Sequence, residues 1–179
     1  SSMSDCGFAM NFATNVKVSE EASLFFRFDR IYHYPTTDEV AAYHGGGLAQ
    51  NFNFNLNPEE GENYEIGGKW IFGGWSATSS FYLTYLRNEI CYDANSQMNV
   101  NLSPTQRIGC DLELAYDTKY WGASAMFSAV QARFDGGVYD GKDVPLAPNY
   151  YGNVCAYVSP FEWVRLSGRV TFISSQYVG

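Results

Sequence analysis

The chain has 179 residues, a formal net charge of −8, and 17% aromatic and 17% charged residues. This length suits one domain, and the acidic balance excludes the basic surface that a nucleic-acid partner needs. No run of about 18 apolar residues occurs, which excludes a transmembrane helix but leaves open strands in which apolar and polar residues alternate. The first residues carry neither the charged nor the apolar part of a signal peptide, so we expect a mature chain or a fragment.

Eight aromatic-rich segments follow one another along the chain, and in several of them apolar and polar residues alternate. Within residues 107–116, the apolar Ile108 and Leu112 stand at even positions, whereas the charged Asp111 and Glu113 stand at odd positions. Because successive side chains of a strand point to opposite faces, this pattern predicts strands and not helices. The expected strands are residues 7–18, 22–31, 62–73, 76–91, 105–118, 121–134, 149–159 and 162–176.

The connections between these segments alternate between short and long, which is typical of a transmembrane β-barrel with tight turns at one rim and long loops at the other. Short turns pair neighbouring strands. We therefore predict an all-β fold, an antiparallel meander of about eight strands that is a slice of a transmembrane β-barrel, curved but not closed on itself. The expected turns are residues 19–21, 74–75, 119–120 and 160–161, and the long loops are residues 32–61, 92–104 and 135–148.

The two faces of the predicted sheet differ in composition. An arginine or lysine on the lipid face near mid-bilayer costs roughly 2–4 kcal/mol, so charges should gather on the other face. The side chains expected to face lipid are Tyr64, Ile66, Trp70, Phe72, Phe81, Leu83, Tyr85, Ile108, Leu112, Leu114, Val164, Leu166, Val170 and Phe172. Those expected on the other face are Glu65, Lys69, Arg107, Asp111, Glu113, Arg165 and Arg169. A soluble β-sandwich would show the same alternation within strands, but its loops would not alternate so strictly in length.

No catalytic fingerprint appears in the sequence, so we predict that the protein is not an enzyme and has no cofactor. The adjacent carboxylates Asp38–Glu39 and Glu59–Glu60 fit solvated loops, because neighbouring side chains of a strand point apart. The cysteines are scattered without the spacing of a metal site. They are Cys6, Cys91, Cys110 and Cys155.

The longest loop is the candidate ligand-binding segment, because loops on a rigid scaffold often carry function. It alone offers two histidines and several tyrosines near Pro35. A role of these side chains in packing the loop stays open as the alternative. The candidate ligand-contacting residues are His33, Tyr34, Tyr43 and His44.

Five motifs in order resemble those of the TonB-dependent outer-membrane receptors. The first, Phe-Asp-Arg-Ile-Tyr-His-Tyr-Pro-Thr-Thr-Asp-Glu at 28–39, resembles the strand end aromatic-Arg-x-Pro-Thr-x-x-Glu of that family. Residues 57–67 resemble its Asn-Pro…Pro-Glu…Asn-Tyr-Glu-Leu-Gly stretch, and residues 85–90 resemble a hairpin end with Asn-x-Ile. Residues 109–114 are similar to Gly-x-Glu-x-Glu, and residues 135–148 resemble a Gly…Val-Pro-x-x-Pro loop.

Two positions depart from the family's pattern. His33 stands where the family usually has Arg, so that arginine's role does not carry over. The stretch 57–67 holds one proline, Pro58, where the family's pattern has two, so the Pro-Glu match is partial.

The resemblance covers essentially the whole chain but only part of an architecture that combines an N-terminal plug with a barrel of about 22 strands. It implies that residues 1–179 are a partial, C-terminal-side segment of such a barrel in the bacterial outer membrane. Its partners would be outer-membrane lipid, a small-molecule nutrient and, through the absent plug, the TonB complex.

The implied function of the parent receptor is the import of a scarce nutrient, such as a ferric siderophore, a cobalamin or a glycan, without catalysis. Two alternatives remain open. One is a complete small eight-stranded outer-membrane barrel with a structural or adhesive role, and the other is a soluble β-rich binding domain.

Overall fold

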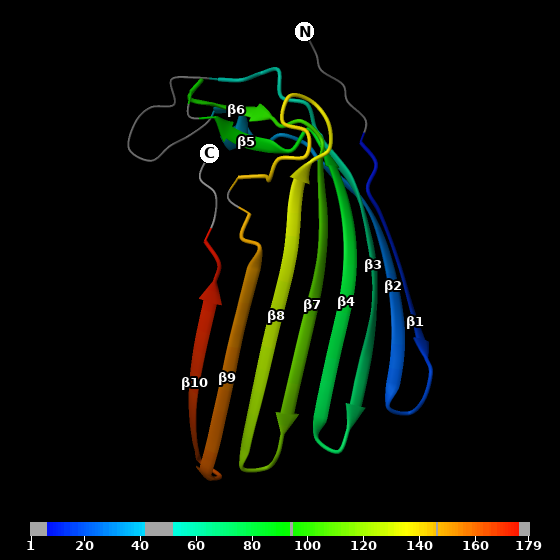
Figure 1. Ribbon diagram of the computed structural model, residues 1–179, viewed down its shortest axis with the longest axis vertical. Helices are drawn as coiled ribbons and strands as arrows, with labels where there is room; N and C mark the ends of the chain where they lie inside the picture. Colours follow the sequence, from blue (N-terminus) through cyan, green and yellow to red (C-terminus); the bar gives the residue numbers. More distant parts are fainter. Residues whose placement is uncertain (1–6, 42–51, 94, 146, 176–179) are drawn as a thin grey trace.

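The computed structural model describes residues 7–41, 52–93, 95–145 and 147–175. Its main body is one eight-stranded antiparallel sheet in the order β1-β2-β3-β4-β7-β8-β9-β10, so that successive long strands pair with each other (Figure 1). This arrangement confirms the predicted meander. The strands are β1 (Met10–Lys17), β2 (Ala22–His33), β3 (Glu59–Phe72), β4 (Trp75–Arg87), β7 (Thr105–Asp117), β8 (Trp121–Phe134), β9 (Tyr150–Phe161) and β10 (Val164–Ile173).

Three short elements lie inside connections for which we expected no regular structure. A single helical turn, α1 (Thr37–Ala41), follows β2, and a small hairpin of β5 (Ile90–Asp93) and β6 (Met98–Asn101) separates β4 from β7. The start of this hairpin falls in the expected strand 76–91, because β4 ends at Arg87 and β5 begins at Ile90. The expected strand was therefore too long. The chain breaks that strand at Asn88, whose φ of 57° is left-handed, a conformation that asparagine adopts more readily than most residues.

The short turns are near their expected places and lie together at one end of the sheet, whereas the long connections lie together at the other end (Figure 1). The tightest turn joins β3 to β4 through Gly73 and Gly74, with φ values of 56° and 86°. Two positive φ values in succession are the geometry of a two-residue hairpin turn, and glycine supplies them without a steric penalty. The last turn lies at residues 162–163, beyond the expected 160–161, because β9 continues to Phe161.

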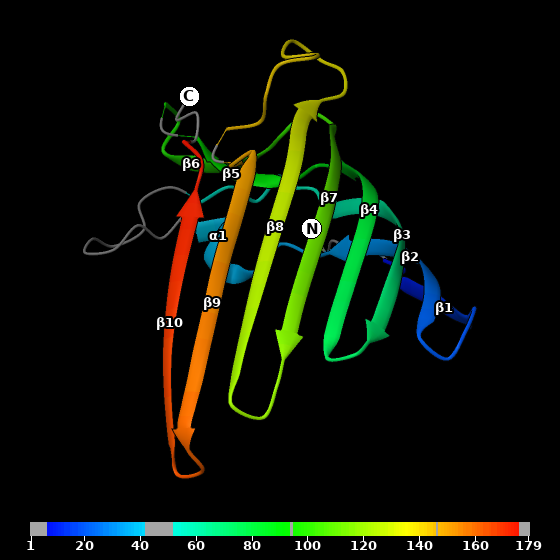
Figure 2. The same ribbon diagram turned by 60° about the horizontal axis from the view of Figure 1, so that its bottom comes forward.

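The sheet is curved and open, and it bends around the side on which α1 and the β5–β6 hairpin lie (Figure 2). Among the described residues β1 pairs only with β2 and β10 pairs only with β9. A complete barrel would require a ladder between β1 and β10. The reading as a closed eight-stranded barrel is therefore wrong for this part of the chain.

Pairing fixes which side chains share a face, because directly opposed residues of antiparallel strands point the same way. One row runs Phe28–Tyr64–Leu83–Ile108, and the next row runs Asp29–Asn63–Thr84–Arg107. We call the face of the first row the outer face. The face of the second row, on which the β5–β6 hairpin lies, is the inner face.

Both predicted sets of side chains fall on the expected faces, with one exception. A shift in register between Val164 and Leu166 interrupts the outer row at Val164. The outer set is largely exposed, with 60% exposure of Ile66 and 65% of Phe81, so it does not form a dry core between two sheets. A soluble sandwich is therefore also excluded for the described residues. No helix among these residues has the length and apolar character needed to cross a membrane.

Candidate functional site at the loop rim

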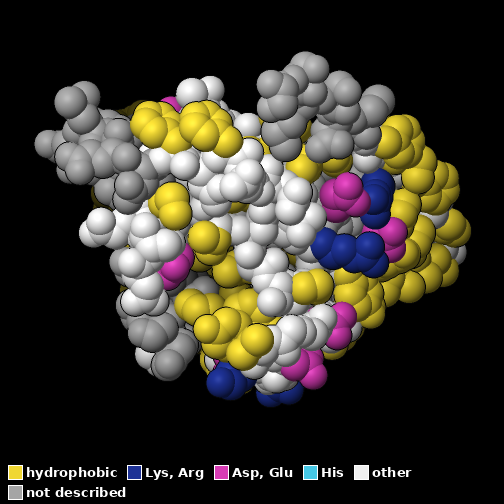
Figure 3. Space-filling view, turned by 90° about the horizontal axis from the view of Figure 1, so that it is seen from above, with side chains coloured by type: hydrophobic (Ala, Val, Ile, Leu, Met, Phe, Trp, Pro, Cys, Tyr) yellow, Lys and Arg dark blue, Asp and Glu magenta, His cyan; other side chains and the backbone are white. Residues whose placement is uncertain are grey.

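The end of the sheet that carries the long connections, which we call the loop rim, brings acidic and basic side chains next to one another (Figure 3). His33, the last residue of β2, forms a hydrogen bond of 3.0 Å between its Nε2 and Oε2 of Glu39, which accepts. The same carboxylate accepts a hydrogen bond of 2.7 Å from the backbone N–H of Thr36, and the Thr36 hydroxyl accepts one from Glu39 N–H. This reciprocal pair is a capping box that begins α1.

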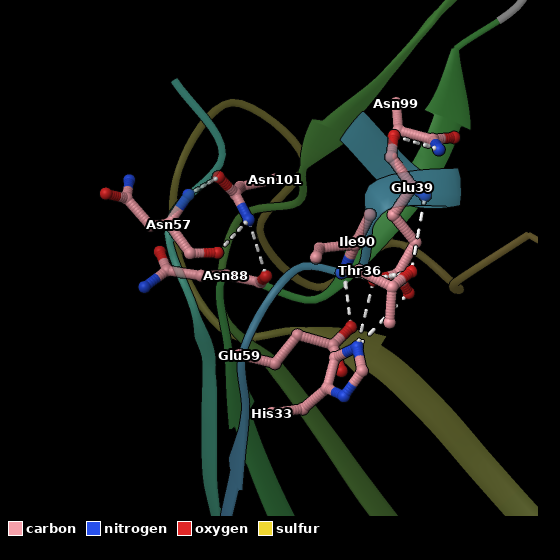
Figure 4. Close-up of polar contacts among 9 residues, drawn as sticks. All are labelled: His33, Thr36, Glu39, Asn57, Glu59, Asn88, Ile90, Asn99 and Asn101. Carbon is pink, nitrogen blue, oxygen red and sulfur yellow. Dashed lines mark hydrogen bonds and ion pairs between the residues drawn. The ribbon is translucent and has the colours of Figure 1, made fainter. Parts of the chain in front are cut away.

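A second carboxylate, Glu59, lies opposite His33 in the ladder between β2 and β3. Its Oε1 accepts a 2.6 Å hydrogen bond from the backbone N–H of Ile90 and so ties the first residue of β5 to the sheet. Figure 4 shows His33 and Glu59 side by side, with Glu39 reaching toward the same point from α1. The end of β2, the helical turn and the hairpin therefore meet at one junction, which we call the rim junction.

Asparagine side chains hold the hairpin to the segment that precedes β3. Asn101 binds the backbone of Asn57 with both ends of its amide: its Oδ1 accepts from Asn57 N–H at 2.8 Å, and its Nδ2 donates to Asn57 C=O at 3.0 Å. The same Nδ2 donates to the carbonyl of Asn88 at 2.7 Å (Figure 4). Side-chain amides here satisfy backbone groups that no strand pairs, as buried and half-buried polar groups require.

A matching set of contacts holds β6 to α1. Asn99 Nδ2 donates to the Glu39 carbonyl at 2.7 Å, and Asn53 Nδ2 donates to the Asn99 carbonyl at 2.8 Å. Asn53 N–H also donates to the Val40 carbonyl at 2.9 Å. Residues that are about 46 positions apart in sequence are thereby joined across the rim.

The hairpin is also bonded to the inner wall through Glu89. Its Oε1 forms an ion pair of 2.6 Å with Arg107 Nη2, and its Oε2 accepts from the hydroxyl of Thr105, which is 1% exposed. Leu102 and Ala147 pack against a small buried apolar cluster of Ala132, Phe134 and Val144. Ala132 lies opposite Arg107 in the ladder, so this cluster covers the inner face. The loops therefore fold over the concave side and not away from it.

Glu39 is a rim group whose ionisation the structure perturbs. Burial by itself would raise the pKa of Glu39. The hydrogen bonds from Thr36 and the interaction with His33 outweigh burial and hold the pKa below its ordinary value. A charged carboxylate is thus built into the start of α1.

The expected ligand-contacting residues have different positions in the structure. His33 belongs to the rim junction, and Tyr34 is 48% exposed beside it. Tyr43 and His44 lie outside the described residues. Sequence reasoning missed Glu39 and the rim residues that hold the hairpin, although Thr-x-x-Glu at 36–39 is a recognisable capping signal. These residues are Glu59, Glu89, Asn53, Asn57, Asn99 and Asn101.

The inner face carries a polar ladder that crosses four strands. Asp29 accepts hydrogen bonds from Asn11 and, at 3.2 Å, from Asn63, and Asn63 accepts one of 2.7 Å from Thr84. Arg27, in the next inner row of β2, forms an ion pair of 2.9 Å with Asp29. Charges that cluster on this face need water or a polar partner, as inside a barrel.

Aromatic rings on the inner face lie flat over glycines of the neighbouring strand. A Cβ at Gly109 would collide with the Tyr82 ring, and one at Gly67 would collide with Phe25. The inner wall is therefore smooth where these pairs lie. Among the described residues, no group of three or more His, Cys, Asp or Glu could hold a metal ion.

The outer face carries a belt of aromatic rings near the turns. Trp75 packs on Tyr116 with ring centroids 4.7 Å apart, and Tyr116 packs on Trp121 at 5.1 Å. At the loop end of β4 the outer face carries Tyr85. The stretch from Trp75 to Tyr85 covers about 33 Å of strand, or about 25 Å after the tilt usual in membrane barrels, which matches the apolar band of such barrels. Tryptophan and tyrosine favour the two interfaces between a membrane and water, which border that apolar band.

Comparison with known proteins agrees with this geometry. The family model described as "TonB dependent receptor-like, beta-barrel" matches residues 7–179. No curated protein matches the sequence. The siderophore receptor PirA from Pseudomonas aeruginosa has a similar structure with a TM-score of 0.71 at 14% identity, covering 94% of this chain and 31% of that one.

Two further solved structures show the same fold. The copper transporter OprC gives a TM-score of 0.69 at 13% identity, and the match covers 91% of this chain and 26% of the OprC chain. The ferric yersiniabactin uptake receptor FyuA from Yersinia pestis gives a TM-score of 0.65 at 16% identity, and the match covers 90% of this chain and 24% of the FyuA chain. The chain thus spans about a quarter to a third of these proteins. The family match over nearly all residues, together with the one-layer sheet and its two faces, shows that this chain belongs to the TonB-dependent receptor β-barrel family.

Proposed function

We propose that residues 1–179 form one stretch of the barrel wall of an outer-membrane receptor that imports a scarce nutrient, with the plug and the remaining strands supplied by other parts of the receptor. The observation that carries this proposal is the contrast between an apolar outer face with aromatic belts and a polar inner face on the same strands. That contrast suits a wall with lipid on one side and a water-filled or plug-filled lumen on the other.

The proposed surroundings follow from the same faces. Lipid of the bacterial outer membrane covers the outer face, and the short turns lie on the periplasmic side. The loop rim then lies on the extracellular side, where barrels of this kind carry their longer loops. The receptor works without catalysis, and energy reaches it through contact between the plug and the TonB complex.

The proposed ligand is a small nutrient of low abundance. Neighbours of similar fold are named as a siderophore receptor, a ferric yersiniabactin uptake receptor and a copper transporter, which favours a metal ion or its chelate. A ferric siderophore is therefore our first candidate, and cobalamin and a glycan are the others.

The proposed contacts are His33, Tyr34, Tyr43 and His44. The position of Tyr34 supports its part in this set, because its ring is half exposed directly after the rim junction has fixed His33. The hydrogen bond between His33 and Glu39 and the pairing of β2 hold the backbone on its N-terminal side, and the hydrogen bond from Thr36 N–H to Glu39 holds it on the C-terminal side. A side chain on such a support meets a ligand with little further loss of conformational freedom.

The test measures nutrient uptake by cells in which the chromosomal receptor gene is deleted and the full-length receptor, wild type or variant, is expressed in its place. Tyr34→Ala and His44→Ala should each lower uptake of the transported nutrient while leaving the amount of folded barrel unchanged. Tyr120→Ala is the matched control, because Tyr120 is also exposed but lies in the short turn between β7 and β8. His33→Ala should lower uptake too, but it also removes the partner of Glu39.

Glu39→Gln separates the two roles of His33. If His33 acts only by holding α1, Glu39→Gln and His33→Ala will have equal effects on uptake. If His33 also contacts the ligand, His33→Ala will have the larger effect. Uptake that is unchanged in Tyr34→Ala and His44→Ala across ferric siderophores, cobalamin and glycans would remove these residues from the site.

A further inference from the structure

The charged side chains of the outer face are confined to its loop end. Strand pairing places all of them in the two rows nearest the loops of β2, β3, β4 and β8. Below these rows the outer face of the described strands is uncharged down to the turns. The charged side chains on this face are Arg30, Glu60, Glu62, Arg87 and Arg133.

Every cation in this set is an arginine, and the three are not equally engaged. Arg30 is bound at 2.7 Å to Glu60 and at 3.3 Å to Glu62. Arg133 pairs loosely with Asp143 at 3.4 Å. Arg87 is exposed and forms no ion pair with the described residues, although it lies opposite Glu60 in the ladder, because Glu60 turns toward Arg30.

Arg87 also opens onto a hollow of about 210 Å³ at the loop end of β3 and β4. Arg30, Glu60, Glu62 and Tyr85 line the hollow with it, and Asp135 lies on its loop side. Since Arg30 engages both glutamates, the Arg87 guanidinium is the donor left to a bound group. A planar guanidinium can offer two parallel N–H donors to a phosphate.

The height of Arg87 above the apolar band fits a lipid headgroup. Tyr85 marks the upper interface, and Arg87 lies two residues farther along β4, about 6.6 Å beyond it. The headgroup layer of one leaflet is roughly 5–8 Å thick, the difference between the full bilayer and its hydrocarbon core shared between two sides. A phosphate in this layer would therefore lie level with Arg87.

We propose that Arg87 binds the phosphate of an anionic lipid headgroup in the outer leaflet. The inference rests on the membrane placement given under the proposed function, with the loop rim outside. Tyr85 then lies at the acyl boundary just below, and Arg30 stays bound to the two glutamates. The outer face then has a lipid anchor at one rim and an uncharged aromatic belt at the other.

The experiment places the full-length receptor in nanodiscs of phosphatidylcholine that contain a minor fraction of phosphatidic acid. Native mass spectrometry then measures which lipids stay on the protein after extraction. We expect the wild type to retain phosphatidic acid in preference to phosphatidylcholine. Arg87→Gln should lower this preference about fivefold, as removal of one cation near an anionic surface does, and Arg87→Lys should restore part of it. Arg169→Gln, which removes an arginine from the inner face, should change nothing.

Three results would overturn the proposal. The first is equal retention by Arg87→Gln and the wild type, and the second is an equal loss in Arg169→Gln. The third is release of the lipid by inorganic phosphate at low concentration, which would indicate a site for the free anion and not for a headgroup. Folding of each variant is checked by the heat-dependent shift in its electrophoretic mobility. The assay needs neither nutrient nor TonB complex, so its failure is distinct from a failure of the proposed import function.

Discussion

The outer and inner faces of this sheet are made from the same strands, and adjacent residues along each strand point to opposite faces, one apolar and one polar. On β3, Glu65 faces inward between Arg27 and Tyr82, while Ile66 faces outward between Phe26 and Phe81. The outer face has no charge between its belts, and the inner face carries a hydrogen-bonded polar ladder. A slip of one residue would exchange the two sets, so the register is fixed by the cost of placing either set in the wrong solvent.

The largest effect is expected from a charge in the middle of the outer face. Phe81→Arg should cost roughly 2–4 kcal/mol of barrel stability, because the guanidinium would lie near the bilayer midplane. Glu113→Arg, on the inner face, should cost far less. The measurement is equilibrium unfolding of the full-length receptor in lipid vesicles.

This pair of variants separates the membrane account from a soluble one. Phe81 is 65% exposed in the isolated chain, and an exposed position of a soluble protein tolerates substitution within about 0.5 kcal/mol. Equal stability of Phe81→Arg and Glu113→Arg would contradict the assignment of the faces.

A bulky side chain in place of a glycine tests how tightly each face is packed. Gly109→Val should destabilise by about 1–3 kcal/mol, because its side chain would enter the space of the Tyr82 ring on the neighbouring strand. Tyr82→Ala in the same chain should recover much of that loss. Gly168→Val is the matched control, because Gly168 has open space around its Cβ position. A larger loss at Gly168 would reverse the comparison.

The inner face is also expected to stabilise the loops that fold over it. Glu89→Gln removes the charge that pairs with Arg107 while keeping the size of the side chain, and it should weaken the attachment of the hairpin by about 1 kcal/mol. Amide hydrogen exchange should become faster in β5 and β6 and stay unchanged in β3 and β4. Exchange that speeds up equally in all strands would mean that the hairpin is part of the wall's own stability.

The smallest effect is expected from acid at the rim junction. The pKa of Glu39 is lower in the folded state than its ordinary value of 4.5, so its contribution to stability is present above that value and is lost as the pH falls through the lower, folded pKa. Exchange of the α1 amides should therefore increase in that acidic window. Glu39→Gln should remove this dependence. A dependence that persists in Glu39→Gln would assign it to another group.

The wall could be predicted from sequence because its residues obey one simple period. The alternation of even and odd positions was enough to assign Tyr64, Glu65 and Ile66 to their faces. The pairing of neighbouring strands followed from short turns such as Gly73–Gly74. The loop rim follows no such period. Asn101 recognises the backbone of Asn57 from 44 positions away, and a contact of this kind leaves no local pattern in the sequence.

The paired carboxylates of the loops show the same limit. Glu39 and Glu59 were expected to be solvated, and the capping signal at Thr36 would have given Glu39 its role. Glu59 had no such signal, because its partner is a backbone N–H of Ile90 in a hairpin that composition alone did not predict. The register shift at Val164 was equally hidden, since an irregular turn does not interrupt the alternation of residues.

The most direct test of the two faces is a scan of single cysteines along β3 in the full-length receptor in lipid bilayers, with the native cysteines replaced. A spin label at each position from Asn63 to Trp70 reports its contact with oxygen dissolved in lipid and with a water-soluble nickel chelate. We predict a period of two residues, with even positions such as Ile66 accessible to oxygen and odd positions such as Glu65 shielded from it. Accessibility without this period, or with oxygen reaching the odd positions, would contradict the account.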